Sequence, residues 1–324
     1  MKTTTLRGTD LTVSRACLGT MTFGGQTNPA ESGHILDHAL EVGVNFIDTA
    51  NNYTDGNSEK ILGDLLRKDG RRDRVVLATK VFNHVKGDPT EDQGLGRANV
   101  VKSVEASLQR LQTDHIDLLY LHCPDRSVPI EETLGAVDAL VQAGKVRHLG
   151  MSNYASWQMG DAVHASARLN ITRPAVTQVP YNIITRAVDE ECAEFVQAHG
   201  FGVTVYNPIA AGLLTGKHRI ESPATDTRFQ QSEVYYERYW HPGNFRAVER
   251  LSDIADDLGI SLIEMAMRWV YSQPIVDSVI IGASRPVQIE QSLSVPDEPL
   301  DETTLKMCDA IWADLRGPHF KYNR

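Results

Sequence analysis

The stretch Arg97–Cys123, RANVVKSVEASLQRLQTDHIDLLYLHC, holds the pattern that decides the fold. Its first part repeats apolar residues three and four positions apart, at Val100, Val101, Val104, Leu108 and Leu111. This spacing indicates an amphipathic helix. Its second part, His115–Cys123, is a short and mostly apolar run, which is typical of a buried strand. A helix followed at once by a buried strand is the repeating unit of an α/β protein with a parallel sheet.

The same alternation runs along most of the chain. Eight apolar or β-branched runs are expected to be strands, over residues 16–24, 44–50, 74–82, 115–123, 146–153, 175–182, 202–209 and 278–284. A helix-like stretch follows each of the first six within a few residues. Eight such units predict a closed (β/α)8 TIM barrel that comprises residues 1–324 as a single domain. An open doubly wound sheet would need a GxGxxG turn after its first strand, and the chain has GTMTFGGQ there.

Further helices are predicted from the glycine residues that end them. Helices are expected over residues 28–43, ending at Gly43, and 129–144, ending at Gly144, and two more over 249–273, split at Gly259. Residues 3–16 are expected to form a hairpin that closes the bottom of the barrel. The polar and aromatic stretch 218–242 has little periodicity and is expected to be a long, functional loop at the carboxyl face.

Composition narrows the function classes. The chain has 324 residues, of which 41% are hydrophobic, and a net charge of −10, which argues against broad binding to nucleic acids or anionic membranes. Its start has no apolar run of signal-peptide length, and 18 consecutive apolar residues occur nowhere, so a cytoplasmic protein is expected. Four scattered cysteines and 11 histidines fit no metal-binding motif, so no metal is expected.

Polar residues stand where the predicted strands end. In a parallel barrel these ends surround the active site, and they carry Asp48, Lys80 and His122 on three successive strands, with Tyr53 in the loop after Asp48. Each has an ordinary alternative: Asp48 could cap the next segment, Lys80 could extend to the barrel rim, and His122 could be a core histidine. Charged groups inside apolar strands are costly unless they pair, so together they predict one site.

The four side chains suit proton donation to a carbonyl oxygen. A phenol has a pKa near 10, which a neighbouring ammonium is expected to lower, and a carboxylate would fix that ammonium. The imidazole could orient the carbonyl or share the proton. The sequence shows no hydrolytic triad and no metal motif, so the electrons must come from elsewhere. Hydride transfer from a dinucleotide is the reaction class that this set predicts.

Several motifs resemble the aldo-keto reductase superfamily of NADPH-dependent reductases. They are NFIDTANNY (45–53), LATK (77–80), LLYLHCPD (118–125), GMSNY (150–154), YNPIAAGLLTGK (206–217) and IIGASRPVQIEQS (280–292). They occur in the family's order, and the resemblance runs from Thr5 to the end of the chain. It implies a catalytic tetrad of Asp48, Tyr53, Lys80 and His122, with Tyr53 as the general acid.

The resemblance also implies an NADPH/NADP+ site. The nicotinamide would lie against Ser152, Asn153, Gln178 and Tyr206, with Thr20, Met21 and Asp48 nearby. The pyrophosphate would bind Asn207, Pro208, Ile209, Ala210, Gly212, Leu213 and Lys217. The 2′-phosphate and adenine would meet Gly282, Ser284, Arg285, Gln288, Gln291 and Ser292, and Arg228 is either a phosphate contact or a surface residue. Ser292 departs from the family, which commonly has Asn at that position.

Within the superfamily, YNIITRAVDEE, RFQQSEVYYERYW and the final FKYNR look most like the branch of aflatoxin-aldehyde and succinic-semialdehyde reductases. That branch implies small carbonyl substrates, often bearing an acid, and a homodimer. Arg238 and Arg324 match its substrate-carboxylate arginines, although surface charge is the other reading of both. Two alternatives remain: a cofactor-binding partner protein that resembles potassium-channel β-subunits, and an NAD(P)-dependent sugar or polyol dehydrogenase.

Overall fold

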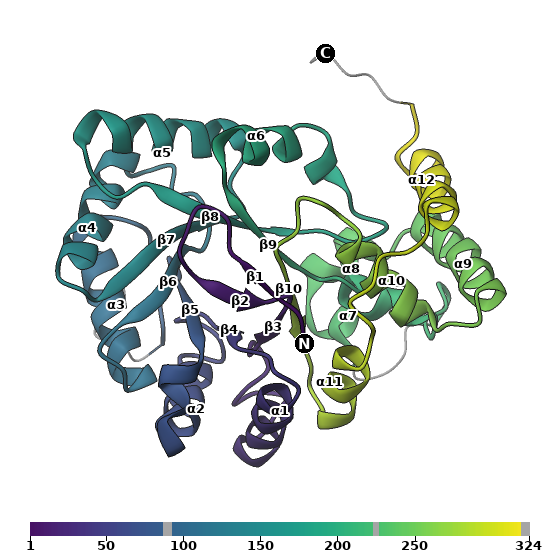
Figure 1. Ribbon diagram of the computed structural model, residues 1–324, viewed down its shortest axis with the longest axis horizontal. Helices are drawn as coiled ribbons and strands as arrows, with labels where there is room; N and C mark the ends of the chain where they lie inside the picture. Colours follow the sequence, from purple (N-terminus) through teal and green to yellow (C-terminus); the bar gives the residue numbers. More distant parts are fainter. Residues whose placement is uncertain (87–92, 223–226, 319–324) are drawn as a thin grey trace.

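Eight parallel strands close into a barrel in the computed structural model, which describes residues 1–86, 93–222 and 227–318 (Figure 1). Their order around the barrel follows the chain, and β10 closes it against β3. The strands are β3 (Ala16–Gly19), β4 (Phe46–Asp48), β5 (Val76–Val81), β6 (Ile116–Leu121), β7 (Val146–Ser152), β8 (Pro174–Pro180), β9 (Gly202–Tyr206) and β10 (Ser278–Gly282). The predicted (β/α)8 fold is confirmed, with each observed strand inside or within one residue of its predicted range.

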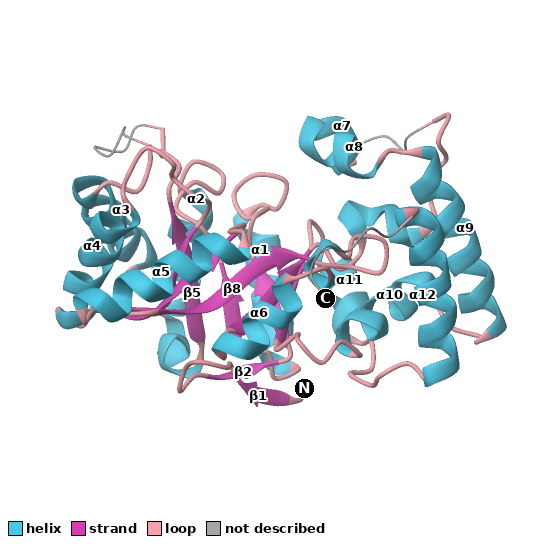
Figure 2. Ribbon diagram, turned by 90° about the horizontal axis from the view of Figure 1, so that it is seen from above, coloured by secondary structure: helices cyan, strands magenta, loops and turns pink. Residues whose placement is uncertain are grey.

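Helices surround the barrel and cover its outer face (Figures 1 and 2). They are α1 (Pro29–Glu41), α2 (Asn57–Leu66), α3 (Arg97–Leu111), α4 (Ile130–Gln142), α5 (Ser156–Leu169), α6 (Cys192–His199), α9 (Pro242–Asp257), α10 (Leu262–Tyr271), α11 (Pro286–Leu293) and α12 (Glu302–Arg316). Short 3-10 segments are η1 (Lys68–Arg74), η2 (Ala187–Asp189) and η3 (Ala210–Thr215). The predicted glycine end signals hold: Gly43 and Gly144, at φ +89° and +73°, follow the ends of α1 and α4, and Gly259, at φ +67°, lies between α9 and α10. At the other end of α1, Asn28 and Glu31 form a capping box that was not predicted from the sequence.

The predicted N-terminal hairpin is present as β1 (Thr3–Thr5) and β2 (Thr12–Ser14), which pair antiparallel. Its turn includes Gly8, at φ +77°, a backbone angle that suits glycine. Leu6 and Val13 are buried in the same cluster as Phe46 and other residues of the barrel interior. The hairpin therefore closes the amino end of the barrel, as expected, and leaves the carboxyl end for the site.

The prediction that residues 218–242 form one long loop is wrong in part. This stretch holds two short helices, α7 (Arg228–Gln231) and α8 (Glu233–Tyr239), on the side of the barrel opposite to β1 and β2 (Figure 2). Trp240 anchors them: its ring lies 5.1 Å from that of Phe229 and 4.9 Å from that of Phe245. Helices of four and seven residues are too short to show a helical period, so tertiary contacts rather than pattern form them.

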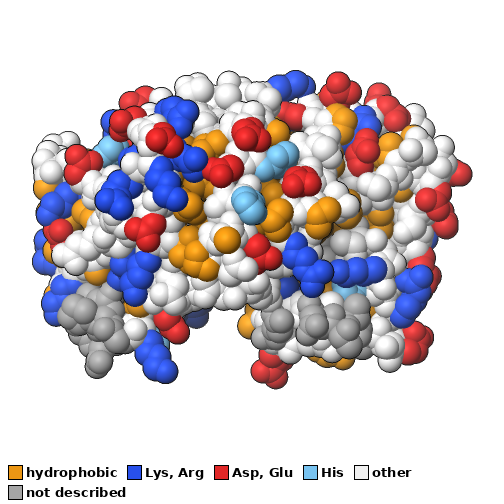
Figure 3. Space-filling model, turned by 90° about the horizontal axis from the view of Figure 1, so that it is seen from below, with side chains coloured by type: hydrophobic (Ala, Val, Ile, Leu, Met, Phe, Trp, Pro, Cys, Tyr) orange, Lys and Arg blue, Asp and Glu red, His pale blue; other side chains and the backbone are white. Residues whose placement is uncertain are grey.

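Acidic and basic side chains are interspersed over the face seen in Figure 3, without one large region of a single sign. Within the described ranges, no helix is both long enough and apolar enough to cross a bilayer.

Candidate active site

A cavity of about 740 Å³ opens at the carboxyl end of the barrel. Strand ends contribute its floor, through residues such as Gly19 of β3, Asp48 of β4, Ser152 of β7 and Gln178 of β8. Loops and the α7–α8 segment form its rim. This is the end at which the sequence placed the polar strand-exit residues, and the structure brings them together there.

Asp48 and Lys80 form a buried ion pair below the cavity. Lys80 is fully buried and Asp48 is 2% exposed. The Lys80 ammonium also donates to the Thr49 carbonyl oxygen at 2.7 Å and lies 3.2 Å from the Tyr53 hydroxyl. Asp48 receives a second hydrogen bond, of 2.9 Å, from Nε2 of Gln178. Lys80 therefore does not extend to the rim and Asp48 caps no helix, so the ordinary alternatives for both residues are wrong.

The loop that carries Tyr53 folds back over the strand ends. Three successive residues, Thr54, Asp55 and Gly56, have positive φ and turn the chain tightly into α2. Ser58 secures the turn, because its amide donates to the Tyr53 carbonyl and its hydroxyl donates to the Thr20 carbonyl at 2.8 Å. The strand exit and the turn together place the phenol beside the ammonium.

Electrostatics at Tyr53 differ from the sequence-based expectation. Burial raises the pKa of the Tyr53 phenol, and although Lys80 lowers it, the net pKa stays above the usual value. Burial lowers the pKa of Lys80, but Asp48 and Tyr53 raise it more, so its net pKa is also raised. The expectation of a net lowered phenol pKa is therefore wrong, because desolvation outweighs the ammonium. At neutral pH the phenol is protonated and the lysine is charged.

His122 stands across from the phenol. The two rings meet edge to face, with centroids 5.9 Å apart. Burial and the charge of Lys80 lower the pKa of His122 to about 3, so the imidazole is neutral near pH 7. Its Nδ1 is buried and has no hydrogen-bond partner among the described residues. A neutral imidazole facing the cavity can donate a hydrogen bond to a carbonyl oxygen but does not compete with Tyr53 as a charged acid.

The later strand exits form a connected polar wall. Asn153, at φ +63°, donates to the His122 carbonyl oxygen at 3.0 Å, and its Oδ1 accepts from the Tyr206 hydroxyl at 2.8 Å. Burial raises the pKa of Tyr206 to about 12, against a lowering by the Arg238 guanidinium. The Tyr206 ring is thereby fixed at its outer end, beside Ser152 and Gln178 on the cavity wall.

The wall beyond β9 has features of an anion site. Its backbone turns repeatedly through positive φ, at Asn207, Ala210, Ala211 and Gly212. Three cationic side chains, Lys217, Arg228 and Arg238, line the cavity, and none forms an ion pair with a described residue. Among the described lining residues the only carboxylate is Asp48, which Lys80 neutralises. The cavity therefore carries positive charge in a chain whose net charge is −10.

Unpartnered polar atoms lie on the same wall. Nδ2 of Asn207, Nδ1 of His218 and Oγ1 of Thr227 are buried, and none has a hydrogen-bond partner among the described residues. Buried polar groups normally have partners, so these atoms are suited to a ligand with several oxygen or nitrogen atoms. A phosphorylated dinucleotide has such atoms along its length, and the donor set and positive charge fit it.

The cavity wall includes most of the predicted ligand contacts. These are Thr20, Met21, Asp48, Ser152, Asn153, Gln178, Tyr206, Asn207, Pro208, Ile209, Gly212, Lys217, Arg228, Arg238, Gly282, Ser284, Gln288, Gln291 and Ser292. Ala210 and Leu213 are buried behind the wall, and Arg285 is exposed at the start of α11. Arg324 lies outside the described residues.

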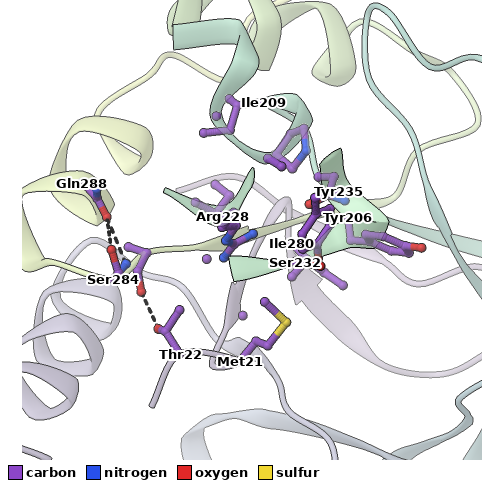
Figure 4. A pocket seen from close by; sticks show the side chains of 18 of the residues that line it. Met21, Thr22, Tyr206, Ile209, Arg228, Ser232, Tyr235, Ile280, Ser284 and Gln288 are labelled. Atoms are coloured by element: carbon purple, nitrogen blue, oxygen red, sulfur yellow. Dashed lines mark hydrogen bonds between the residues drawn. The ribbon is translucent and has the colours of Figure 1, made fainter. Parts of the chain in front are cut away.

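Other lining residues carry no sequence signal that singles them out. Tyr235, Ser232 and Val234 come from the α7–α8 segment, and Asn52 comes from the Tyr53 loop. In Figure 4 the Arg228 side chain lies between Ser284 and Gln288 on one side and Tyr206 and Tyr235 on the other. Tyr235 lines the cavity because of how residues 227–239 fold, so the sequence alone could not predict its position.

Comparison with known proteins agrees with this geometry. Residues 15–313 match the family model described as "Aldo/keto reductase family". The chain belongs to the aldo/keto reductase family. Within the described residues, no cluster of three His, Cys, Asp or Glu side chains could hold a metal ion.

The relatives include proteins named as potassium channel subunits and proteins named as reductases. A probable voltage-gated potassium channel subunit beta of Arabidopsis thaliana is 37% identical over 86% of this chain and 85% of its own length. Aflatoxin B1 aldehyde reductase member 2 of Rattus norvegicus is 36% identical over 91% of this chain and 83% of its own. Aldo-keto reductase YhdN of Bacillus subtilis is 34% identical over 99% of this chain and 97% of its own length. The predicted resemblance to aflatoxin-aldehyde reductases is confirmed, and the channel-subunit resemblance is equally strong.

Proposed function

We propose that this protein is an NADPH-dependent reductase that converts aldehydes or ketones to alcohols, with Tyr53 as the general acid. The family supports an oxidoreductase acting on carbonyls. The observation that carries the finer assignment is the chain from Asp48 through Lys80 to Tyr53, which ends at the floor of the cavity. A partly buried phenol held by a fully buried ammonium has no evident structural purpose there, because packing alone would favour apolar residues.

Each of the four residues has its own role in the proposed reduction. A bound NADPH would supply the hydride. Tyr53 donates its proton to the substrate oxygen, and Lys80 stabilises the phenolate that remains. Asp48 keeps the ammonium in place and charged, since its carboxylate raises the pKa of Lys80. Neutral His122 orients the carbonyl oxygen toward the phenol by a hydrogen bond.

The cofactor assignment rests on charge and on unpartnered atoms. Asn207, His218 and Thr227 offer buried polar atoms, and Lys217 and Arg228 offer cations. The Arg228 side chain reaches across to β10, since a Cβ at Gly282 would lie 3.7 Å from its Nη2. An arginine in that place suits the dianionic 2′-phosphate that distinguishes NADPH from NADH. Ser152, Asn153, Gln178 and Tyr206 would hold the nicotinamide.

A substrate that bears a carboxylate fits the guanidinium of Arg238, which lines the cavity beside the phenols of Tyr206 and Tyr239. This side chain stands beside Tyr206 and Tyr239, both of which raise its pKa against the lowering by burial, and it faces the cavity. Arg324 is proposed as a second contact from its sequence position alone. Substrate preference is measured by comparing succinic semialdehyde with an uncharged aldehyde in wild type and Arg238→Ala. A loss confined to the acid-bearing substrate supports the assignment, and an equal loss for both removes it.

The central test is turnover by wild type and Tyr53→Phe. Consumption of NADPH is followed with 4-nitrobenzaldehyde and succinic semialdehyde. Tyr53→Phe is expected to lower kcat by about 10²- to 10⁴-fold while NADPH still binds, because only the proton donor is removed. Tyr181→Phe is the matched control, since Tyr181 is buried but bonds Asp189 outside the cavity. Wild-type turnover in Tyr53→Phe would disprove the role of the phenol.

A second candidate is a cofactor-binding partner protein, and the 37% identity to a potassium channel subunit beta favours it. The same tetrad and cofactor site would serve that role. The distinguishing result is tight NADPH binding without turnover of any aldehyde in a panel of aromatic, aliphatic and acid-bearing compounds. Turnover above about 1 s⁻¹, in the ordinary range for enzymes, favours the reductase.

The proposal also covers the cellular location, the oligomeric state and the number of domains. We propose a cytoplasmic location, and the four free cysteines support it because a reducing compartment keeps thiols unpaired. A homodimer is proposed by similarity to the branch and is tested by light scattering. Residues 1–324 are proposed to be one domain, which predicts a single cooperative unfolding transition.

A further inference from the structure

His218 is a buried histidine on the cavity wall, a few residues after η3. The side chain lines the cavity, and the residue is only 4% exposed. Its Nδ1 is buried, and neither ring nitrogen forms a hydrogen bond with a described residue. A Cβ at Gly212 would lie 3.8 Å from Nε2, so this nitrogen faces the turn of η3. Buried polar groups normally have partners, so this imidazole is suited to a partner that arrives with a ligand.

Two aromatic side chains hold the imidazole ring. It meets Phe229 of α7 edge to face, with centroids 5.1 Å apart, and it meets Trp240 in the same way at 5.7 Å. Trp240 is itself fixed, because its Nε1 donates to the carbonyl oxygen of Ile220 at 3.2 Å. Aromatic rings attract cations, so these contacts can stabilise an imidazolium without a carboxylate.

The charged groups nearest to His218 are basic. Burial and the charge of Lys217 lower the pKa of His218 to about 4, so the imidazole is neutral near pH 7 in the free protein. The guanidinium of Arg219 donates to the His218 carbonyl oxygen at 2.9 Å, and η3 has no ionisable side chain. The carboxylates of Glu221, Glu233 and Glu237 are exposed. The other ionisable groups described on α7, α8 and the segments beside them are Arg228, Tyr235, Tyr236, Arg238, Tyr239 and His241.

We propose that His218 takes up a proton from solvent when the pyrophosphate of a dinucleotide enters the cavity, and that the imidazolium then binds it. The backbone beside Nε2 supports this, since Ala211 and Gly212 have positive φ, and turns of this kind present N–H groups to phosphates. A phosphate at this turn favours the charged imidazole, against the effect of burial and Lys217. Proton uptake and binding are linked, so affinity should rise as the pH falls. The dinucleotide part rests on the proposed function, whereas a charge on His218 that depends on an anion does not.

Two variants separate the charge from the packing. His218→Gln removes the titrating group and keeps polar atoms at the wall. His218→Phe also removes it and keeps the aromatic contacts with Phe229 and Trp240, so the two variants should behave alike. His199→Gln is the matched control, because the His199 ring also packs on an aromatic residue, with its centroid 4.4 Å from that of Phe195, but does not line the cavity.

The first readout is the charge of the ring itself. Histidine side chains are labelled with ¹⁵N, and the His218 signals are identified by their loss in His218→Gln. At neutral pH they should report a neutral ring in the free protein and a charged ring with saturating NADPH or inorganic pyrophosphate. A ring that stays neutral with both compounds overturns the inference. A change with inorganic pyrophosphate but not with NADPH supports the anion site and removes the dinucleotide part.

The second readout is affinity, measured by calorimetric titration. NADPH should bind about tenfold more weakly to His218→Gln and His218→Phe than to wild type at about pH 6, the size expected for one hydrogen bond to a charged group, and less than about twofold more weakly at about pH 8. His199→Gln should follow wild type at both. Comparing the proteins at the same pH cancels the titration of the 2′-phosphate itself. Equal pH dependence in wild type and His218→Gln overturns the inference.

The compound 2′-AMP identifies the phosphate concerned, because it carries a 2′-phosphate and no pyrophosphate. It should bind equally to wild type and both His218 variants at each pH. A loss equal to that for NADPH overturns the assignment to the pyrophosphate. Wild type that binds neither NADPH nor 2′-AMP refutes the proposed function, and the ¹⁵N measurement with inorganic pyrophosphate then still decides the charge of His218.

Discussion

Lys80→Met tests the ion pair at the floor of the cavity most directly. The substitution removes a fully buried ammonium and leaves the Asp48 carboxylate, 2% exposed, with Gln178 as its remaining donor. Breaking a buried pair from one side costs about 3–5 kcal/mol, because the surviving charge stays desolvated. With about 2.1 cal/mol/K of unfolding entropy per residue, the 324-residue chain should lose about 4–7 °C in Tm.

The double variant Asp48→Asn/Lys80→Met removes both charges and should recover more than half of the lost stability. Lys145→Met is the matched control, since Lys145 pairs with Glu105 at a site where both side chains are more than one-third exposed. It should change the free energy of unfolding by no more than about 1 kcal/mol. All variants are compared by thermal and urea unfolding. NADPH-dependent turnover is measured in parallel, and both Lys80→Met and Asp48→Asn/Lys80→Met should abolish it.

The difference in stability between wild type and Lys80→Met should also change with pH in a definite direction. Lys80 has a raised pKa in the folded state, so its contribution to stability is present below the ordinary lysine value of 10.5 and is lost as the pH rises through the folded value. Wild type and Lys80→Met should therefore differ most at neutral pH and converge in strong alkali. The reasoning fails if Lys80→Met is within about 1 kcal/mol of wild type at pH 7, or if the double variant is no more stable than the single one.

Three further predictions follow from individual contacts. Because the pKa of His122 is lowered to about 3, wild type should lose stability as the pH falls from about 6.5 toward 3, and His122→Asn should lose less of it in acid unfolding. Gly150→Ala places a Cβ 2.5 Å from the Tyr120 ring and should cost about 1–3 kcal/mol in urea unfolding. Arg228→Ala should weaken NADPH binding about tenfold and NADH binding little, as measured by fluorescence titration.

The barrel and the meeting of Asp48, Lys80 and His122 at one end of it could be predicted because both depend on local pattern. A buried strand needs a continuous apolar run, and a charged or polar residue at its end is noticeable against that background, as with Lys80 in LATK. In a parallel barrel all strand ends meet at one face, so residues from distant motifs, such as Asp48 and His122, can be placed together without knowing the turns between them.

The parts that could not be predicted depend on contacts between distant segments. The α7 and α8 helices form around Trp240, and the sequence of this stretch has no helical periodicity that would predict them. Tyr235 reaches the cavity only because these helices fold over it. The contacts of Tyr120 are similarly hidden: it looks like an ordinary strand residue until its ring is found to lie over Gly150 with its hydroxyl at Thr204.

The pKa of Tyr53 bears on the direction of the reaction. Proximity of an ammonium suggests a lowered phenol pKa, but burial raises it further than Lys80 lowers it. A phenol that remains protonated at neutral pH is ready to donate a proton, as reduction of a carbonyl requires. Oxidation of an alcohol needs the same group as phenolate, which becomes abundant only in alkali. We therefore expect the ratio of oxidation to reduction rates to rise steadily with pH.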